Sequence, residues 1–555
     1  MIVGIDLGTT NSLIAAHIDG NPTIIPNERG NRLTPSIVSI AESGEILVGE
    51  SAKNQAVVHA DRTVPAVKRR IGSQHTFTLG QRMMSPEEVS SQILRSLKRS
   101  AQLYLGEEVR EAVITVPAHF NDAQRQATRE AGRLAGLQVR LLINEPTAAA
   151  LAYASRGGKG RRVVVYDLGG GTFDVTCLER QGEEFYVRST LGDNNLGGVD
   201  FDRLLGERVR TAFEEQSGLA FRDDPFMEQQ LAELVERAKI ELSSNPTAGI
   251  VLPFMGTSGR PMHLRYDISR EEFEAIIEPL VARSLTLTSK ALDEAGFDAP
   301  DALVLSGGSS RVPLVQRVLE ERFGVASAPL VNPDEVVALG AAIHARALAT
   351  GAGGNLHDVT SYALGVEIDG GSVIQVIRRN TPLPAHSSRV FTTIADMQEV
   401  AEVHVVQGDS PKAKDNISLG RFTLSGIERG RKGNPRIEVS FSVDEDGMTQ
   451  VYARDIHTGS TERITIIPAL ESDDPAAEER RLATLIRRVE QLLEVGHAEL
   501  ERSFVAEASE ILAGARRVTL AADSRERSEY RLALESLVRE LNTYPQEAEQ
   551  AGGTA

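Results

Sequence analysis

Two short segments of the chain combine an aspartate, glycines and threonine hydroxyls. Residues 6–10 read Asp-Leu-Gly-Thr-Thr and residues 167–172 read Asp-Leu-Gly-Gly-Gly-Thr, so the two aspartates are 161 positions apart (167 minus 6). Each segment lies between two apolar runs that predict a β-hairpin. Glycines let backbone N–H groups approach phosphate oxygens, threonines add hydroxyl donors, and paired aspartates hold Mg²⁺, commonly through its waters. A cleft lined by both tips suits a polyphosphate with a divalent cation, and ATP is the obvious candidate.

Two other phosphate-binding patterns are absent from the sequence. It contains no G-x-x-x-x-G-K-[ST] run, and no G-x-G-x-x-G opens a helix after a strand. The P-loop and the dinucleotide-binding fingerprint are therefore excluded. A third glycine turn, over residues 305–311, follows an apolar strand and precedes a helix, so that helix N-terminus could approach the nucleotide.

The order of apolar patterns predicts several domains. Residues 1 to about 350 alternate short β-branched runs with amphipathic stretches, which is typical of an α/β fold. The two similar hairpins indicate two homologous half-domains that face one cleft; a chance likeness of two glycine-rich turns is the alternative. Residues 351–358 have linker composition. Beyond them, short strands are expected at 389–394, 399–407, 436–443 and 462–467, followed by helices to about residue 544.

Composition limits the classes of partner and compartment. The 555 residues are enough for about three domains. Sixty basic and 78 acidic residues give a net charge of −18, which argues against nucleic acid or an anionic membrane as a partner. A single cysteine, Cys177, cannot form an internal disulfide, and neither a signal peptide nor a long apolar run is present. These features predict a cytoplasmic protein.

Five longer motifs resemble the DnaK-type heat shock protein 70 family. They occupy residues 4–12, 116–118, 121–128, 144–150 and 167–174, among them Asn-Glu-Pro-Thr-Ala-Ala-Ala at 144–150. The similarity covers the first 350 residues and, more loosely, residues to about 470, and the short chain is most similar to the bacterial HscC-type subgroup. The resemblance implies a multidomain fold. Its expected parts are a duplicated actin-like α/β ATPase domain (1–354), an interdomain linker (355–359), an all-β peptide-binding sandwich (360–470), a short α-helical lid (471–545) and a flexible tail (546–555).

The resemblance also implies cofactors and site residues. ATP/ADP and Mg²⁺ are expected, with K⁺ as a further candidate, and Asp6 and Asp167 would lie near the metal's water shell. Lys68 is expected to touch the γ-phosphate and orient the attacking water, with Glu145 close by. The implied catalytic residues are Lys68, Glu145, Asp167 and Thr172, and the implied nucleotide-binding residues are Asp6, Thr9, Thr10, Gly170, Gly171, Gly197, Gly198, Glu236, Lys239, Ser243, Gly307, Gly308, Ser309 and Arg311.

If the family resemblance is set aside, some of these residues have ordinary structural interpretations. Lys68 would be a solvated surface lysine. Glu236, Lys239 and Ser243 share one face of a helix and would be a surface stripe of salt bridges. Pro117 would merely end a strand, whereas the resemblance makes Pro117, Arg125 and Asp358 an interdomain switch.

The β-domain resembles a sandwich that holds an extended apolar segment through backbone hydrogen bonds and one deep side-chain pocket. An arch of two side chains, here Asp369 and Ile394, would cross over the bound segment. Ordinary packing in the sandwich core is the alternative for each pocket candidate. These candidates are Val366, Phe391, Ala401 and Val403.

Several positions depart from the family pattern. Asp369 replaces a small or apolar arch residue and should disfavour acidic clients, and Ala401 should widen the pocket. The linker keeps a single leucine, Leu356, which predicts weaker coupling between domains. His119 replaces an aromatic residue, and Leu141 replaces the arginine with which many members dock J-domain cochaperones. A dedicated J-domain protein, or none, is therefore expected.

Together these features predict a cytoplasmic, monomeric, ATP-hydrolysing molecular chaperone. Its clients would be unfolded or extended polypeptides, with a J-domain cochaperone and a nucleotide exchange factor as candidate partners. Two alternatives remain. One is a nucleotide-gated scaffold for a single dedicated partner, and the other is a small-molecule kinase on an actin-like fold, against which the β-domain and helical tail argue.

Overall fold

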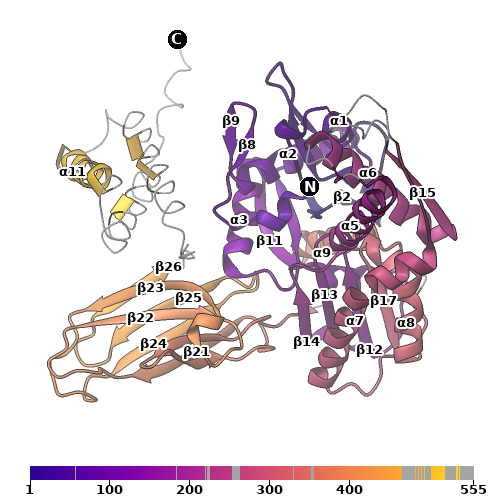
Figure 1. The fold of residues 1–555 in the computed structure, drawn as a ribbon. Coiled ribbons are helices and arrows are strands. Elements are labelled where there is room, and N and C mark those ends of the chain that lie inside the picture. Colours follow the sequence, from indigo (N-terminus) through magenta and orange to yellow (C-terminus); the bar gives the residue numbers. More distant parts are fainter. Residues whose placement is uncertain are drawn as a thin grey trace, which may run out of the picture. The chain divides into compact units, whose positions relative to one another are not determined.

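The structure is a computed structural model, and it divides into two compact units, Met1–Ala469 and Leu470–Ala555. It describes residues 1–465, except 57, 183, 219, 222–224, 253–262, 329–330 and 352–355, together with residues 502–518 and isolated positions between 482 and 537. Many of the elements are labelled in Figure 1, in which colour follows the sequence from indigo at the N-terminus to yellow at the C-terminus. None of the described helices is long and apolar enough to span a membrane.

The first large sheet holds the N-terminal hairpin. Its strand order is β11-β10-β1-β2-β3, with β4 paired to β2. Strand β1 is antiparallel to β2 and parallel to β10. The hairpin tip at residues 7–10 therefore leaves the sheet where β1 ends at Asp6. The strands are β1 (Ile2–Asp6), β2 (Asn11–Ile18), β3 (Asn21–Ile25), β4 (Thr34–Pro35), β10 (Glu111–Val116) and β11 (Gln138–Asn144).

The second large sheet repeats this arrangement with the order β17-β12-β13-β14-β18. Strand β12 is antiparallel to β13 and parallel to β17, and Asp167 lies at the end of β12 as Asp6 lies at the end of β1. The similar hairpins of the sequence thus occupy equivalent places in two sheets. The strands are β12 (Arg162–Leu168), β13 (Phe173–Gln181), β14 (Glu184–Asp193), β17 (Ala302–Ser306) and β18 (Leu356–His357).

Part of the expected linker is a strand. Leu356 and His357 form β18 and pair in parallel with Phe185 and Tyr186 of β14. The imidazole of His357 stacks on the Tyr186 ring, with centroids 4.4 Å apart and planes at 9°. This stack and the backbone pairing attach the segment to the sheet, although its composition predicted only a connection. Residues 352–355 lie outside the described residues.

Helices and small sheets complete this part of the chain. Helix α2 begins with a reciprocal cap between Ser85 and Glu88, and α3 with one between Asn121 and Gln124. The helices are α1 (Glu50–Ala56), α2 (Pro86–Leu105), α3 (Asp122–Leu134), α4 (Glu145–Ser155), α5 (Gly198–Ser217), α6 (Pro225–Ser244), α7 (Arg270–Ala295), α8 (Pro313–Phe323) and α9 (Val336–Thr350). The small strands are β5 (Ile37–Ile40), β6 (Ile46–Val48), β7 (Thr63–Pro65), β8 (Phe77–Leu79), β9 (Arg82–Met84), β15 (Thr247–Leu252) and β16 (Leu264–Ser269).

Residues 360–465 form a β-sandwich with one apolar core between two four-stranded sheets. The sheet orders are β20-β19-β22-β23 and β21-β24-β25-β26. The strand predicted at 389–394 is wrong in its bounds, because β21 ends at Phe391 and Ile394 lies in the loop that follows. The strands are β19 (Leu364–Ile368), β20 (Ser372–Ile377), β21 (Ala385–Phe391), β22 (Val400–Gln407), β23 (Ile417–Ser425), β24 (Ile437–Val443), β25 (Thr449–Asp455) and β26 (Thr461–Thr465).

Most of the second unit lies outside the described residues, including the expected tail at 546–555. Within it the structure describes helix α11 (Arg502–Val518). Ala508, Leu512 and Ala515 of this helix share an apolar cluster with Leu482 and Leu534. This packing gives the predicted lid region, 471–545, a helical apolar core of its own.

A close helix–helix crossing supports the two large sheets. Helix α9 packs against both α4 and β1. A methyl group at Gly340 of α9 would overlap the carbonyl oxygen of Ala148 in α4, and one at Gly4 of β1 would overlap the backbone of Ala342. Only glycine permits these approaches, so the crossing fixes the position of α4, whose first residue is Glu145.

Replacing Gly340 by alanine should therefore destabilise the part of the chain that holds the two large sheets by about 3 kcal/mol or more, because backbone must move to admit the methyl group. The matched control is Gly206→Ala in helix α5, where an added methyl group meets no atom within 4 Å. That control should stabilise the domain by about 0.5–1 kcal/mol. Thermal and urea unfolding of both variants would measure the difference, and equal stability of the two would contradict this account of the crossing.

Candidate nucleotide site and its connection to the β-domain

A cavity of about 420 Å³ lies between the two hairpin tips. Residues from both tips, from the turn at 306–309 and from helix α6 line it. The structure thus brings together positions up to 331 residues apart in the sequence (337 minus 6). The sequence-predicted residues in its wall are Asp6, Thr9, Thr10, Lys68, Glu145, Asp167, Gly170, Thr172, Glu236, Lys239, Ser243, Gly307, Gly308, Ser309 and Arg311.

Three predicted glycines lie just behind this wall. Gly198 N donates to Gly169 O at 3.0 Å, and the next amide, of Val199, donates to Gly170 O at 2.8 Å. A methyl group at Gly197 would come within 2.6 Å of Gly171 N. Gly171, Gly197 and Gly198 therefore hold the shape of the glycine loop by packing the start of helix α5 against it.

Lys68 is buried, with 4% of its surface exposed, and is not the solvated lysine that its sequence context alone suggests. It lies in a 3₁₀ turn (Val67–Arg70), and its Nζ donates to Oε1 of Glu145, the first residue of helix α4. Both side chains line the cavity. The pair therefore presents an ammonium group and a carboxylate side by side to whatever occupies the site.

The cavity carries more negative than positive charge around Lys68. Burial raises the pKa of Asp6 to about 6 and that of Glu145 to about 7, and Lys68 opposes both shifts. Burial also raises the pKa of Asp167 well above its ordinary value. Carboxylates in this condition gain stability from a bound cation. Asp6 and Asp167 supply carboxylate oxygens, which suit Mg²⁺, an ion that usually keeps several of its waters.

Helix α6 and the third glycine turn form the far end of the cavity. Lys239 Nζ donates to Asp202 Oδ2 at 2.7 Å and to Gly198 O at 3.1 Å. Glu236 pairs with Lys53 at 2.8 Å, and Arg311 pairs with Asp334. Glu236 and Lys239 thus form ion pairs with residues of other helices, Lys53 of α1 and Asp202 of α5, while Ser243 forms none, and all three side chains line the cavity.

Arg69, next to Lys68, makes structural contacts that the sequence analysis did not predict. Arg69 Nη2 donates to Gly171 O at 3.0 Å, and its guanidinium pairs with Asp200. Asp200 Oδ2 also accepts from Gly197 N at 2.9 Å. Arg69 thus ties the turn that carries Lys68 to the glycine loop and to the start of α5. Nothing in the sequence distinguishes it from Arg70, which is its neighbour.

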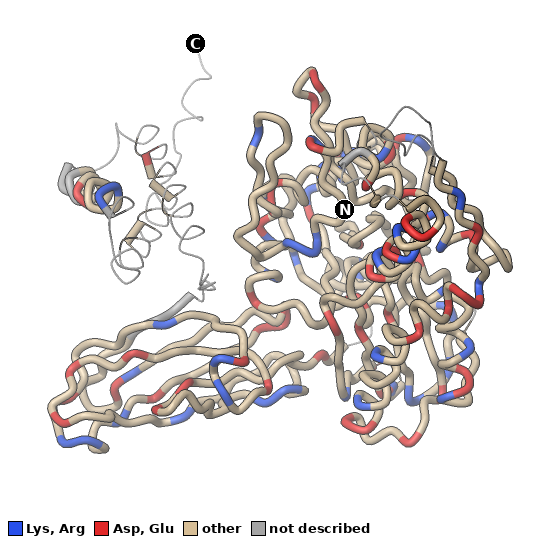
Figure 2. Tube along the Cα trace, viewed as in Figure 1, with Lys and Arg blue, Asp and Glu red and all other residues tan. Residues whose placement is uncertain are grey.

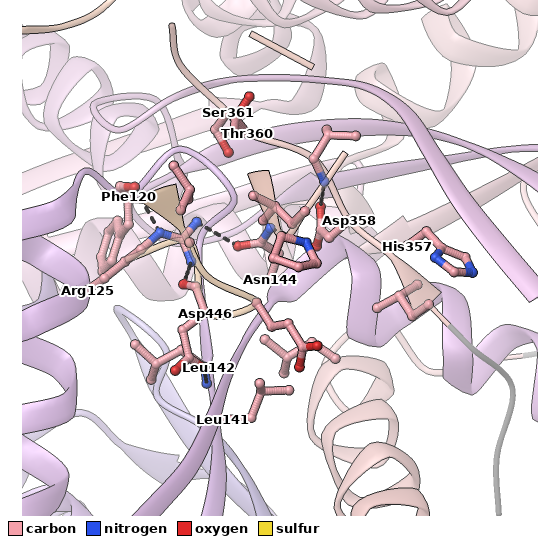
Figure 3. A pocket seen from close by; sticks show the side chains of 18 of the residues that line it. Phe120, Arg125, Leu141, Leu142, Asn144, His357, Asp358, Thr360, Ser361 and Asp446 are labelled. Atoms are coloured by element: carbon pink, nitrogen blue, oxygen red, sulfur yellow. Dashed lines mark hydrogen bonds between the residues drawn. The ribbon is translucent and has the colours of Figure 1, made fainter. Parts of the chain in front are cut away.

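A buried arginine connects this region to the β-domain (Figure 3). Arg125 is 5% exposed; its Nε donates to Phe120 O at 3.2 Å, and its Nη2 donates to Ala118 O at 3.1 Å and to Asn144 Oδ1 at 2.8 Å. Its Nη1 donates to Asp446 O, in the turn between β24 and β25, at 3.1 Å. Of the three predicted switch residues, Arg125 and Asp358 therefore belong to one network, since Asn144 Nδ2 donates to Asp358 Oδ2 at 2.9 Å.

Pro117, the third predicted switch residue, follows the end of β10 and accepts a backbone hydrogen bond from Phe120 at 3.1 Å. It shapes the loop whose carbonyls at 118 and 120 accept from Arg125. His119, in the same loop, bonds through Nδ1 to Asp174 at 3.1 Å, and its carbonyl accepts from the Tyr362 hydroxyl at 2.9 Å.

Further contacts with the β-domain involve residues that the sequence analysis did not identify. Asp446 Oδ1 accepts from Leu142 N at 2.7 Å, and its other oxygen pairs with Arg129. Asp122 Oδ1 accepts from Thr449 N at 2.8 Å. The acidic turn between β24 and β25 is therefore held by strand β11 and helix α3 together.

Comparison with known proteins agrees with this architecture. The family model "Hsp70 protein" matches residues 2–79 and 75–552. The chain belongs to the Hsp70 family. Proteins named "Chaperone protein DnaK" from Thermotoga neapolitana, Thermotoga petrophila and Thermotoga maritima are each 46% identical over 476 residues, which is 84% of this chain and 80% of theirs. The family assignment is thereby confirmed, and the HscC-type subgroup stays a prediction.

In this Hsp70 chain the predicted client-pocket residues lie in or against the sandwich core. Val366, Ala401 and Val403 are 4%, 8% and 5% exposed, as ordinary core residues would be. Phe391 is half-buried and packs against the same core. Asp369 is exposed in the turn after β19, and Ile394 is 60% exposed in the loop after β21. Their role in binding a client stays a prediction.

Lys68→Ala should slow hydrolysis of bound ATP by at least about a hundredfold, because it removes the one buried ammonium group beside Glu145. The matched control is Arg70→Ala in the same turn, since the Arg70 side chain has no hydrogen bond or ion pair with the described residues. Single-turnover hydrolysis and the ATP dissociation constant would be measured for both. Similar losses in the two variants would count against a direct role for Lys68.

Proposed function

We propose that this Hsp70 chain is an ATP-dependent molecular chaperone in which ATP hydrolysis controls the exchange of exposed apolar polypeptide segments. One observation carries the proposal. A continuous series of contacts runs from Lys68 and Glu145 through the adjacent Asn144 to Arg125 and on to Asp446 of the β-domain. Family membership and the chaperone name of the relatives support it.

The residues of the cavity have separate tasks in hydrolysis. The amides of the glycine loop and the hydroxyls of Thr9, Thr10 and Thr172 bind the phosphates. Lys68 holds the attacking water in line with the γ-phosphate, and Glu145 orients Lys68 and accepts a hydrogen bond from that water. Mg²⁺, when bound near Asp6 and Asp167, neutralises phosphate charge; K⁺ is a further candidate ion.

A change of bound nucleotide affects the β-domain through a displacement of the first residues of helix α4. Asn144 is the N-cap residue and Glu145 the first residue of this helix, so a displacement of Glu145 moves Asn144 as well. Asn144 binds both Arg125 and Asp358. Such coupling changes client exchange only if the two nucleotide states differ in their affinity for the client.

The finer assignments belong to the same proposal. The ATPase domain spans 1–354, the linker 355–359, the client-binding sandwich 360–470 and the lid 471–545, and the protein works as a cytoplasmic monomer. Its clients are extended polypeptides, with a J-domain cochaperone and an exchange factor as candidate partners. Figure 2 shows basic residues interspersed with acidic ones along the described chain, a distribution that does not suit nucleic acid.

A second candidate function is a nucleotide-gated scaffold for one dedicated partner. The exposed Asp369 and the half-buried Leu141 favour it, because both depart from the family pattern at surfaces expected to bind clients and J-domain proteins. A small-molecule kinase has no such support, and any phosphorylated product would overturn the chaperone proposal.

The test is the dissociation rate of labelled apolar peptides in Mg-ATP and in Mg-ADP. ATP should accelerate release by about tenfold or more, as expected for coupled sites. Asp446→Ala should reduce this acceleration while single-turnover hydrolysis persists, because it removes the contacts with Leu142 N and Arg129. Asp415→Ala, at an exposed site of the same domain, is the control. Peptide binding that nucleotide does not alter would favour the scaffold.

Docking of the β-domain on helix α3 should weaken as pH rises from 5 to 7.5. Burial raises the pKa of Asp122 from 3.8 to about 6, although the hydrogen bond from Thr449 opposes the shift. The docked arrangement therefore binds a proton that a solvated carboxylate releases. Its stabilising contribution is complete below about pH 4 and is lost as pH rises through about 6.

Asp122→Asn keeps the acceptor and removes the charge, so docking in this variant should lose that pH dependence and be stronger than the parent at pH 7.5. Energy transfer between dyes on the ATPase domain and the β-domain would measure docking. Asp298→Asn, at an exposed site of the ATPase domain, controls for net charge. An unchanged pH dependence in Asp122→Asn would refute the assignment to this carboxyl group.

A further inference from the structure

A second cavity, of about 500 Å³, lies beside strand β18 where the ATPase domain meets the β-domain (Figure 3). Its walls come from the end of α9, from β11, from β18 and from the turn between β24 and β25. Its volume is within the range, roughly 300–1,000 Å³, of pockets that hold small organic ligands. It shares no lining residue with the nucleotide cavity, so it is a separate site.

Two buried polar atoms at this cavity lack a partner. Gln407, which is 8% exposed, has an Oε1 with no hydrogen bond among the described residues, and the same is true of His357 Nε2. Both residues line the cavity. An unpaired buried polar atom is destabilising because it has lost its hydrogen bonds to water, so a ligand that supplies hydrogen-bond donors here recovers that loss.

The charges around the cavity favour a cation. Arg125 is the only arginine or lysine among the described residues that line it, whereas Asp358, Glu445 and Asp446 contribute three carboxyl groups. Four of the five guanidinium N–H groups of Arg125 are already bound to Phe120, Ala118, Asn144 and Asp446, so at most one is left for an anion. Glu445 is exposed and has no ion pair with the described residues.

The rest of the wall is apolar. Leu141, Leu348, Leu364 and Pro384 lie around the same space. Burial lowers the pKa of His344, which also lines the cavity, so this imidazole is neutral near pH 7. The site therefore offers acceptors and a free carboxylate at one part of the wall and an apolar surface at another.

We propose that this cavity binds a small amphipathic cation, an amidine or amine carried on an apolar ring or chain. Its N–H groups donate to Gln407 Oε1 and to the Glu445 carboxylate, and its apolar part packs among the leucines. Because both domains contribute walls, the bound cation stabilises the arrangement in which β18 is paired and Asp446 is docked. The proposal does not depend on the chaperone activity.

The test uses three ligands of nearly the same shape: benzamidine, benzamide and benzoate. Isothermal titration of the full chain should give saturable binding of benzamidine, weaker binding of neutral benzamide, and binding of benzoate at least about tenfold weaker than that of benzamidine. Failure of benzamidine to bind, or equal binding of benzoate, would overturn the proposal.

Variants locate the site. Gln407→Leu and Glu445→Gln should each weaken benzamidine binding about fivefold or more, and Glu445→Gln leaves the buried core untouched because Glu445 is exposed. Asp415→Asn, an exposed charge of the same domain away from the cavity wall, should bind benzamidine as the parent does. Benzamidine binding that neither Gln407→Leu nor Glu445→Gln alters would place the ligand elsewhere and refute the assignment.

Discussion

The buried guanidinium of Arg125 is the interaction on which the joint between the two domains depends. Burial lowers the pKa of this side chain, and the nearby carboxylates Asp358, Asp122 and Asp446 oppose the shift. Removing a charge from water is costly unless its hydrogen bonds are replaced. Here carbonyls of the 118–120 loop, the Asn144 side chain and the Asp446 carbonyl replace them. If one of these acceptors moves away, a buried N–H group of Arg125 has no partner. Intermediate positions of the two domains are therefore costly, which favours two discrete domain arrangements over a continuous range.

At the nucleotide cavity, the other end of the same network, negative charge is in excess, whereas the buried charge of Arg125 is positive. There the carboxylates of Asp6, Glu145 and Asp167 surround the single ammonium group of Lys68, and burial raises the pKa of all three acids. Asn144 and Glu145 are consecutive, so the excess of negative charge and the buried guanidinium act on adjacent residues of one helix start. If the proposed coupling is correct, a change of charge in the cavity acts on Asn144 through its neighbour Glu145.

The sequence predicts local features of this structure well and long-range ones poorly. Both hairpin tips are found as predicted, because apolar runs and Gly-Thr turns are local signals. Lys68 and Glu145 were identified only through the family resemblance, since their burial depends on residues 77 positions apart. Asp446 was missed because its Asp-Glu-Asp-Gly context is typical of any hairpin turn, and its partner Arg125 is 321 positions away. Alternating strand residues such as Val403 are compatible with a core or a pocket, and spacing cannot distinguish the two.

The pairing of strand β18 explains how a linker with only one leucine is still attached to the second large sheet. Its pairing with β14 uses backbone groups, which every sequence supplies, so the lost leucines remove side-chain packing without removing the ladder. Stacking of His357 on Tyr186 replaces part of that packing, and Asp358 is held by Asn144 and Thr147. Beside the 500 Å³ cavity, the imidazole Nε2 has no hydrogen-bond partner among the described residues. This unpaired polar atom destabilises the structure, and a leucine side chain would not have one. The strength of the joint thus depends on what occupies the space next to His357 as well as on the linker itself.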